Sequence, residues 1–305
     1  MDSTWDALIA DWLARALPAA TPRRSPIVRL PGRASAVIGM RRAGKTWLVL
    51  GDVTQRVAAG ARREHQLYLS FEDERLADVQ ARALGGLLEA WWRRVPDAAT
   101  SHCHLALDEV QNIPGWERFV RRLLDRGGIE VTVTGASARL LSREIATSLR
   151  GRAVTTEVLP FSVDELIRHR GGALPTAWPP PEAERAHLQR AVDDYLDTGG
   201  FPEVVGLSES ERHRVLRDYV DVVLLRDVVE RHGAGNVAAL RRIVRRLASS
   251  PSTTFSVHRL HNDLKSQGIA VGKDTLYEYL DHVEDAYLAA LELLTSLARD
   301  LQRGA

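Results

Sequence analysis

The stretch AVIGMRRAGKTWLVL, residues 36–50, constrains the fold of this chain more than any other feature. Gly39, four further residues and then Gly44-Lys45-Thr46 fit the phosphate-binding loop pattern G-x-x-x-x-G-K-[ST]. An apolar run precedes the loop and a segment with helical spacing follows it, which predicts strand, loop and helix in that order. Backbone N–H groups and a helix dipole would then converge on one anion. A glycine turn that fits the pattern by accident is the alternative, and the flanking strand and helix argue against it.

Lysine usage supports a phosphate site in this loop. The chain has 41 lysine and arginine residues, and only Lys45, Lys265 and Lys273 are lysines. A compact ammonium fits against phosphate oxygens where the planar guanidinium fork does not. We therefore expect Lys45 to contact the β- and γ-phosphates of a nucleotide and the Thr46 hydroxyl to coordinate Mg²⁺. The other residues expected to border the nucleotide are Met40, Arg41, Arg42, Ala43 and Trp47. Of these, Arg41 and Arg42 would touch phosphate or pair with acidic neighbours.

Composition excludes several classes of protein. The 305 residues, 45% hydrophobic and 27% charged, describe an ordinary globular chain of two or three domains. A net charge of +1 gives no overall attraction to nucleic acid, so any basic surface has to be local. The single Cys103 excludes a disulfide framework. The acidic, amphipathic N-terminus is unlike a secretory signal, and no uncharged apolar window is long enough to span a membrane. We expect a cytoplasmic protein.

Short apolar runs alternate with helical stretches over the first half of the chain. The expected strands are 34–38, 66–71, 104–109, 129–135 and 155–160. This alternation is typical of βαβ units and of a parallel sheet covered on both faces. A proline cluster at 174–184 marks a boundary, after which we expect helices only. The predicted domains are an N-terminal helical segment (1–27), a nucleotide-binding α/β domain (28–172), a helical lid (173–234) and a final helical domain (235–305).

An acidic pair supplies the second half of the predicted site. Asp108 ends the strand HLALDE and Glu109 follows it. Asp108 would hold the Mg²⁺ shell, and Glu109 would act as the catalytic base that polarises the attacking water. The alternative is a helix N-cap with a favourable charge at its start. The acidic pair lies on a strand other than the one that adjoins the phosphate loop. This indicates the class of P-loop proteins with an extra strand between these two strands, which includes AAA+ ATPases, helicases and recombinases.

Several long motifs carry a family resemblance. GMRRAGKTWL, LYLSFEDERL, LALDEVQNIPGWERFVRRLLD, VTVTGASARLLSREIATSLRGRAVTTEVLPFSVDEL and YLDTGGFPEVV occur in this order. Together they resemble a large bacterial and archaeal family of predicted AAA+ ATPases, over roughly residues 28–290. The resemblance implies an α/β P-loop NTPase of AAA+ type with a five-stranded parallel sheet, followed by an α-helical lid and a winged helix. It also implies ATP and Mg²⁺ as cofactors.

The resemblance implies further site residues. In this family the fourth strand ends in a threonine, a glycine and then serines, one of which senses the γ-phosphate. This chain has alanine at the first serine, position 136, so Thr134 or Ser137 would have to substitute. The sequence LRGR matches the place of an arginine at a subunit boundary, which makes Arg150 or Arg152 a candidate finger for the ATP of a neighbouring copy. The alternative is an ordinary surface arginine.

The sequence of the C-terminal third indicates a region that binds a partner, but it does not decide whether that partner is DNA or protein. Residues 254–288 have the spacing of two helices around a turn at Gly268, as in a helix-turn-helix. The second helix is acidic, whereas the helix before the pair carries four arginines, so DNA or protein contact is expected through residues 238–288. The family usually continues into a C-terminal domain of unknown function, which is expected to be missing here. The chain would be a natural short form or a fragment, and we expect no nuclease activity.

Three functional hypotheses follow from the sequence. The first is an ATP hydrolase that uses Mg²⁺-dependent turnover to drive a conformational change acting on an unidentified protein or DNA partner. The second is a nucleotide-gated binding switch with little or no hydrolysis. The third is a winged-helix DNA-binding regulator, against which the complete set of Lys45, Thr46, Asp108 and Glu109 argues.

Overall fold

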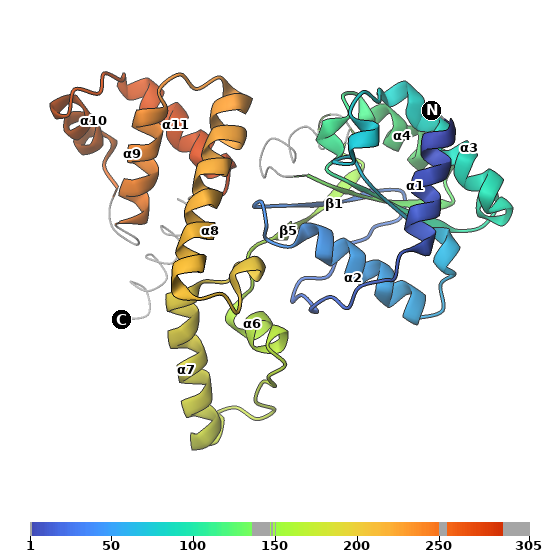
Figure 1. The fold of residues 1–305 in the computed structure, drawn as a ribbon, viewed down its shortest axis with the longest axis horizontal. Helices are drawn as coiled ribbons and strands as arrows, with labels where there is room; N and C mark the ends of the chain where they lie inside the picture. Colours follow the sequence, from blue (N-terminus) through green and yellow to red (C-terminus); the bar gives the residue numbers. More distant parts are fainter. Residues whose placement is uncertain (1, 136–146, 148, 150, 250–254, 289–305) are drawn as a thin grey trace. The chain divides into compact units, whose positions relative to one another are not determined.

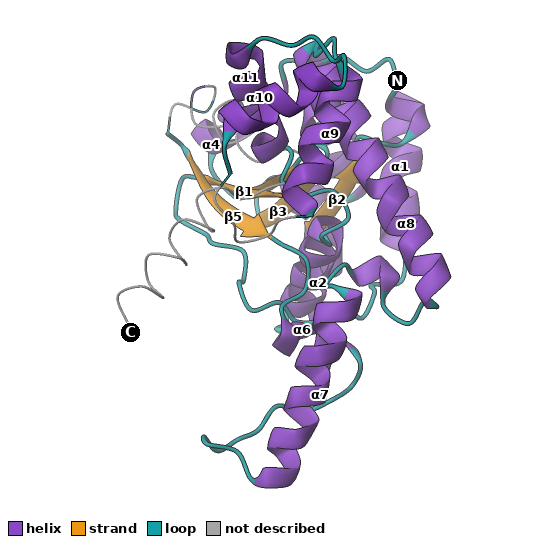
Figure 2. Ribbon diagram, turned by 90° about the vertical axis from the view of Figure 1, so that its left-hand side faces the viewer, coloured by secondary structure: helices purple, strands orange, loops and turns teal. Residues whose placement is uncertain are grey.

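A computed structural model describes residues 2–135, 147, 149, 151–249 and 255–288. The chain forms two compact units, Met1–Val205 and Gly206–Ala305, and each is described by itself. The first unit contains a sheet with helices packed on it, and the second is helical throughout its described residues (Figures 1 and 2).

Five parallel strands form the sheet of the first unit. They are β1 (Ala34–Gly39), β2 (Gln66–Ser70), β3 (Cys103–Asp108), β4 (Ile129–Thr134) and β5 (Ala153–Val158). Their order is β2-β3-β4-β1-β5, so β4 lies between β1 and β3. The predicted strands are confirmed, with ends shifted by at most two residues. The inserted strand expected from the position of the acidic pair is confirmed as well.

The strands are apolar because both faces of the sheet are covered. Every residue of β1 and of β3 is buried. Helix α2 (Lys45–Ala58) lies below the sheet and α4 (Trp116–Arg126) above it in Figure 1, as right-handed crossovers from a central strand require. Parallel strands covered in this way are continuous apolar runs and do not alternate. The strands β1 and β3 follow this rule, whereas β5 alternates between exposed and buried residues from Thr155 to Val158.

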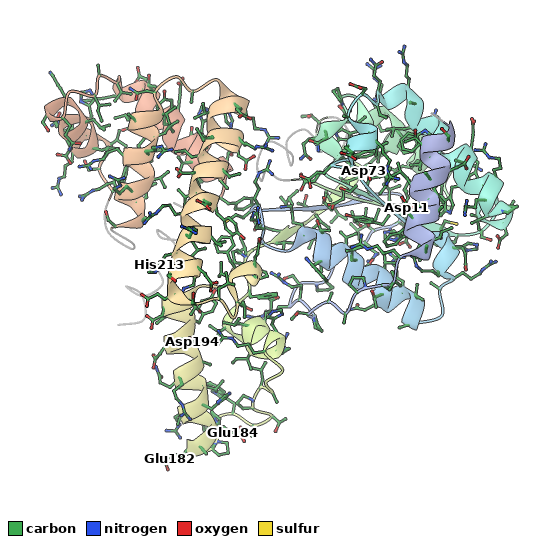
Figure 3. The ribbon with its side chains drawn as sticks, in the orientation of Figure 1. Asp11, Asp73, Glu182, Glu184, Asp194 and His213 are labelled. Carbon is green, nitrogen blue, oxygen red and sulfur yellow. The ribbon has the colours of Figure 1, made fainter. Side chains whose placement is uncertain are left out.

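The N-terminal helix α1 (Asp2–Ala14) packs against the α/β core. The Trp12 indole donates a hydrogen bond to the Gln66 carbonyl at the start of β2 (2.6 Å). Arg75 adds a surface link, because it donates to Asp11 at 2.7 Å and to Asp73 at 2.8 Å; both carboxylates are labelled in Figure 3. The helix also contacts α3 (Leu84–Arg94). Its apolar side is buried in the main core through Trp5, Leu8, Ile9 and Trp12.

The end of the first unit folds back onto the chain that follows β5. Helix α6 (Val163–His169) starts at Ser162 with a capping box, and α7 (Glu182–Thr198) ends at Gly199. Beyond it, the Gly200 carbonyl accepts a hydrogen bond from the Phe161 N–H at 2.7 Å. A Cβ at residue 200 would lie 2.1 Å from the Phe161 carbonyl oxygen, so only glycine fits there.

The second unit is a helical bundle. Helix α8 (Glu209–Val222) continues into the π-helical segment η7 (Val223–Glu230), and α9 (Val237–Ala248), α10 (Val257–Ser266) and α11 (Lys273–Asp285) follow. The two helices expected around Gly268 are confirmed as α10 and α11. Their predicted core is buried at Leu260, Leu264, Leu276, Tyr279, Leu280 and Val283. No helix among the described residues of the chain combines the length and apolar character that crossing a membrane requires.

Candidate functional site

The loop between β1 and α2 has the backbone that a phosphate nest requires. Gly39 has a φ of 142°, and a Cβ there would lie 2.1 Å from the Val158 carbonyl oxygen of β5. Gly44 has a φ of 96° and immediately precedes α2. Both positions favour glycine, since side chains are strained at positive φ and Gly39 has no room for one. The loop therefore leads from the sheet into the N-terminus of α2, where unpaired N–H groups attract anions.

Lys45 lies across this loop. Its side chain is buried, with the residue only 5% exposed. The ammonium donates to the carbonyl of Gly39 at 3.0 Å and to that of Met40 at 2.9 Å. The positive charge is thus held inside the curve of the loop, beside the backbone N–H groups. A contact between Lys45 and the phosphates of a nucleotide stays a prediction.

Asp108 connects the loop to two other strands. The residue is 3% exposed and is the last residue of β3. It accepts hydrogen bonds from Thr46 Oγ1 at 2.8 Å and from Tyr68 Oη at 2.7 Å, and a further one from Thr134 Oγ1. Burial, and then the negative charge of Asp108, raise the pKa of the Tyr68 phenol, which therefore stays protonated as a donor. Carboxylate and hydroxyl oxygens suit Mg²⁺, so Asp108 and Thr46 fit the role of its ligands.

Glu109 has a different environment from its neighbour Asp108. Its backbone is left-handed (φ 55°), and its N–H donates to Thr134 Oγ1 at 3.0 Å. The Gln111 amide donates to its carboxylate. Burial raises the pKa of the Glu109 carboxyl, while the charge of Lys45 opposes that shift. A carboxylate with a raised pKa is a better proton acceptor, which is what a general base needs.

Thr134 is the residue that aligns the acidic pair. Its hydroxyl donates to Asp108 and accepts the Glu109 N–H, so both of these hydrogen bonds go to the pair. A contact between Thr134 and a γ-phosphate stays a prediction. The alternative sensor, Ser137, and the alternative finger, Arg150, lie outside the described residues.

Arg23, which belongs to none of the sequence motifs, links the phosphate loop to the chain after β5. Its guanidinium donates to the Ala43 carbonyl at 3.0 Å, to the Leu159 carbonyl after β5, and to Glu165 at 3.1 Å. The group also stacks over the Phe161 ring, 4.8 Å from its centroid. The Arg23 and Glu165 side chains are 9% and 6% exposed. The partners lie 20, 136 and 142 residues away in sequence, so no local pattern reveals this role.

The loop also contacts the segment that follows α7. Arg42 donates to Glu203 at 2.6 Å, so of the two alternatives for this arginine the acidic neighbour is present. Glu203 belongs to the short helical turn Pro202–Val204. A Cβ at Gly44 would lie 3.8 Å from Pro202 Cγ, which places this turn directly against the loop. Trp47, on the first turn of α2, is 54% exposed.

Arg152 lies at the opposite edge of the sheet from the loop. It precedes β5, and its carbonyl accepts the N–H of Ala34 at the start of β1. The loop begins at the other end of β1, about 17 Å away at 3.3 Å per residue. Arg152 pairs with Asp125 of α4. Its position is incompatible with a contact to the phosphates of its own chain, so a catalytic role would require a neighbouring copy.

The strand order and this loop define the class of the protein. A phosphate loop after β1, and an acidic pair after a strand separated from β1 by one other, give the first unit the α/β fold of P-loop NTPases of the AAA+ type. A family model described as an AAA domain matches residues 32–167. Over these residues the chain is similar to the AAA+ ATPase-like family that its motifs resemble. A second model, a domain of unknown function (DUF8612), matches residues 189–298. The expectation that a C-terminal domain of unknown function is missing is therefore corrected.

Two curated relatives have similar sequences. An uncharacterized protein of Methanocaldococcus jannaschii is 31% identical over 289 residues, which are 94% of this chain and 63% of that protein. An uncharacterized protein of Haemophilus influenzae is 26% identical over 83% of this chain and 60% of its own length. The chain thus spans less than two thirds of either relative. Among solved structures, the ORC2 protein of Aeropyrum pernix in its ADP form aligns with a TM-score of 0.43 and 14% identity, covering 98% of this chain and 93% of that one.

Proposed function

We propose that this protein is an ATP hydrolase whose turnover drives a conformational change acting on a protein or DNA partner. The observation that carries the proposal is the meeting of Lys45, Thr46, Asp108 and Glu109 at the carboxyl ends of β1 and β3, the two strands that flank β4. We assign the helical lid to residues 173–234 and partner contact to residues 238–288. Cofactors of this activity are ATP and Mg²⁺.

Each residue has one task in the proposed reaction. Lys45 and the backbone N–H groups of residues 40–46 hold the β- and γ-phosphates, and Thr46 and Asp108 hold Mg²⁺. When bound, the metal ion neutralises charge that develops on the phosphates. Glu109 accepts a proton from the attacking water, and the Thr134 hydroxyl fixes the backbone from which that carboxylate extends.

Exchange of the Glu109 carboxylate for an amide tests the assignment. We expect Glu109→Gln to lose at least about a hundredfold in ATP turnover, since general-base catalysis contributes about 10²–10⁴-fold. ATP affinity should persist, because Lys45 and the loop are intact. Steady-state phosphate release and equilibrium binding of a fluorescent ATP analogue measure the two quantities. Glu182→Gln, an exposed change at the start of α7, is the matched control. Unchanged turnover in Glu109→Gln would refute the base assignment.

A nucleotide-gated switch is the second candidate, and one observation favours it. Both hydrogen bonds of the Thr134 hydroxyl go to Asp108 and Glu109, and residue 136 is alanine where the family carries a serine. Tight ATP binding with no turnover in either wild type or Glu109→Gln would establish the switch. Turnover that rises faster than protein concentration would support self-association, with Arg152 or Arg150 as a finger in trans. A protein that binds no ATP would leave the winged-helix DNA-binding regulator.

A further inference from the structure

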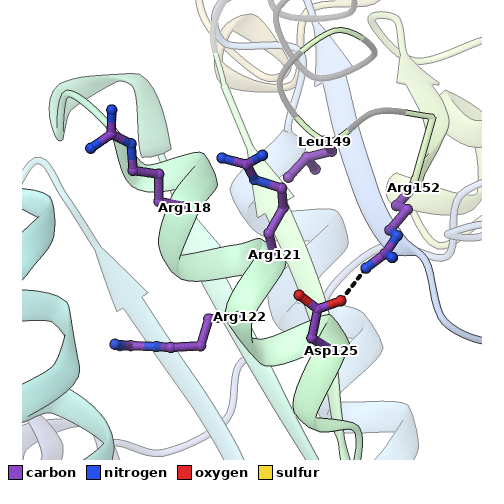
Figure 4. A pocket seen from close by; sticks show the side chains of 6 residues that line it. All are labelled: Arg118, Arg121, Arg122, Asp125, Leu149 and Arg152. Atoms are coloured by element: carbon purple, nitrogen blue, oxygen red, sulfur yellow. Dashed lines mark hydrogen bonds and ion pairs between the residues drawn. The ribbon is translucent and has the colours of Figure 1, made fainter.

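A second charged site lies on the outer side of α4, away from the phosphate loop. A pocket of about 380 Å³ is lined by Arg118, Arg121, Arg122, Asp125, Leu149 and Arg152, here called the arginine pocket (Figure 4). The apolar side of α4 is buried against the sheet through Trp116, Phe119, Val120 and Leu123. The polar side of the helix is therefore left to form one wall of the pocket, and the chain that enters β5 forms the other.

The charges of the arginine pocket do not balance. The lining holds four arginines and a single carboxylate, Asp125, which is already paired with Arg152. The side chains of Arg118 and Arg121 form no ion pair or hydrogen bond with any described residue, whereas the Arg118 backbone N–H bonds to the Gly115 carbonyl at 3.2 Å. Elsewhere in this unit arginines commonly end on carboxylates. Examples are Arg23 with Glu165, Arg29 with Asp52, Arg56 with Glu130, Arg62 with Asp97, Arg75 with Asp73 and Arg93 with Asp6.

This imbalance opposes folding. Arg118 and Arg121 are three residues apart on one helix, and Arg118 and Arg122 are four apart, so their like charges repel. Figure 4 shows Arg118 and Arg121 extending in the same direction, whereas Arg122 points to the other side of α4. The guanidinium of Arg122 instead lies 5.5 Å from the centroid of the Phe119 ring. Arg118 and Arg121 are thus the two unneutralised charges on the open side.

The chemistry of the lining identifies the class of ligand. Its polar groups among the described residues are guanidinium forks and one carboxylate, with no hydroxyl, amide or aromatic ring that could recognise a base or a sugar. Guanidinium groups bind phosphate in bidentate fashion. Arg118 and Arg121 are separated along the helix by about 4.5 Å of rise. Several anions in a row are needed to neutralise both, and consecutive phosphates of one strand provide them.

We propose that the arginine pocket binds the phosphate backbone of a single nucleic-acid strand, without reading its sequence. Arg118 and Arg121 each take a phosphate, and Arg152, held by Asp125, borders the path of the strand. The site is independent of the ATP site, because Arg152 and Asp125 lie at the amino edge of the sheet and the phosphate loop at its carboxyl edge. The overall net charge of +1 makes this a local attraction.

The test is binding of fluorescein-labelled oligo(dT), about 20 nucleotides long, by fluorescence anisotropy without ATP or Mg²⁺. The full chain is compared with Arg118→Gln/Arg121→Gln and with the matched control Arg185→Gln/Arg190→Gln, two exposed arginines of α7. We expect the pocket variant alone to bind about tenfold more weakly at low salt. Between about 50 and 200 mM salt its log–log slope should be smaller by about 1.4, because each lost contact to a single strand removes about 0.7.

Two further arms separate the possible sources of binding. Lys45→Ala should bind oligo(dT) as the wild type does, so a defect in ATP binding is distinguishable from a defect in the pocket. Oligo(dT) should also protect Arg118 and Arg121 of the wild type from modification by phenylglyoxal, which requires no variant to fold. Three results would overturn the proposal: wild-type affinity in the pocket variant, loss of binding only in Lys45→Ala, or equal competition by poly-glutamate of matched charge, which would indicate an acidic protein.

Discussion

The Thr134 hydroxyl shows how much of this site depends on one small group. It bridges two adjacent acidic residues by donating to the Asp108 carboxylate and accepting from the Glu109 backbone. Threonine is 1% exposed at this position, so water cannot replace the lost partners. The bridge fixes the direction in which the Glu109 carboxylate leaves the sheet.

Removal of this hydroxyl should therefore affect turnover more than ATP binding. Thr134→Val has nearly the same volume and leaves one donor and one acceptor unsatisfied, which costs about 1–3 kcal/mol of unfolding free energy. Misplacement of Glu109 should lower ATP turnover by about tenfold, the effect of roughly 1.4 kcal/mol in the transition state. Thr134→Ser keeps the hydroxyl and should restore turnover. The idea fails if Val and Ser variants turn over ATP equally well at equal stability.

At this scale the sequence predicts residues whose chemistry is contained in a local pattern. Gly39, Lys45 and Thr46 belong to one loop motif. The loop has a positive φ at Gly39 and buries Lys45, while contacts with a nucleotide and Mg²⁺ stay predictions. The roles of Tyr68 and Arg23 could not be predicted, because they depend on which residues distant strands and loops bring together. Tyr68 reaches Asp108 only through the pairing of β2 with β3.

Among the elements, the segment that joins α1 to β1 supports the phosphate loop. Arg23, in this segment, holds the Ala43 carbonyl, the chain after β5 and Glu165 of α6 at one point. Glu165 is further fixed by the N–H groups of Arg24 (2.6 Å) and Ser162 (3.0 Å). The segment before β1, the chain after β5 and helix α6 are thus all linked through Arg23 to the carbonyl of Ala43, the residue before Gly44.

We expect Arg23→Lys to weaken ATP binding, because a lysine retains the charge but cannot reach all three partners. A hydrogen-bonding group left without a partner in this buried cluster costs about 1–3 kcal/mol of free energy. If the loop needs this bracing to bind ATP, the loss of about 1.4 kcal/mol lowers ATP affinity by about tenfold. Arg24→Lys is the control, since only the backbone of Arg24 bonds to Glu165. Hydrogen exchange at residues 39–46 should rise in the Arg23 variant alone. A lower melting temperature with unchanged ATP affinity and unchanged exchange would show a merely structural role.

Prediction of elements succeeded where burial imposes a period on the sequence. The strands coincide with short apolar runs, of which β1 and β3 are buried throughout, and α10 and α11 have regular apolar spacing. The π-helical turns of η7 and the docking of Gly200 on Phe161 could not be predicted. The former differs from an α-helix only in backbone hydrogen bonding, and the latter is a contact between residues 39 positions apart. Pairing between residues distant in the sequence decides the contact of Gly200 with Phe161.

For the molecule as a whole, a buried histidine of the sheet lowers the free energy of unfolding at acidic pH. His104 of β3 is fully buried and lies 2.9 Å from the Thr132 hydroxyl of β4. Burial, with a smaller effect of the Arg56 charge, lowers the pKa of His104 from 6.5 to about 3. The unfolded chain therefore binds a proton at His104 between these values that the folded chain does not bind. Stability is lost as the pH falls through this window.

Between pH 7 and pH 5, His104 should cost the folded state about 2 kcal/mol. This range lies above the window in which carboxylates with lowered pKa values, such as Glu130, begin to lose their stabilising charge. Urea unfolding of the wild type and of His104→Gln at the two pH values measures the difference. The variant should lose about 2 kcal/mol less on acidification. An equal loss in both proteins would mean that His104 titrates normally in the fold.

The contact between Arg42 and Glu203 places the phosphate loop two residues from the end of the first unit. Val205 is the last residue of that unit, and the chain continues at Gly206 into the second. A phosphate arriving in the loop would offer Arg42 a competing anion and would repel the Glu203 carboxylate. Binding or release of that phosphate would then change the interactions of Glu203, two residues before the first unit ends at Val205. This surface ion pair would then be the contact by which a phosphate in the loop affects the covalent joint between the two units.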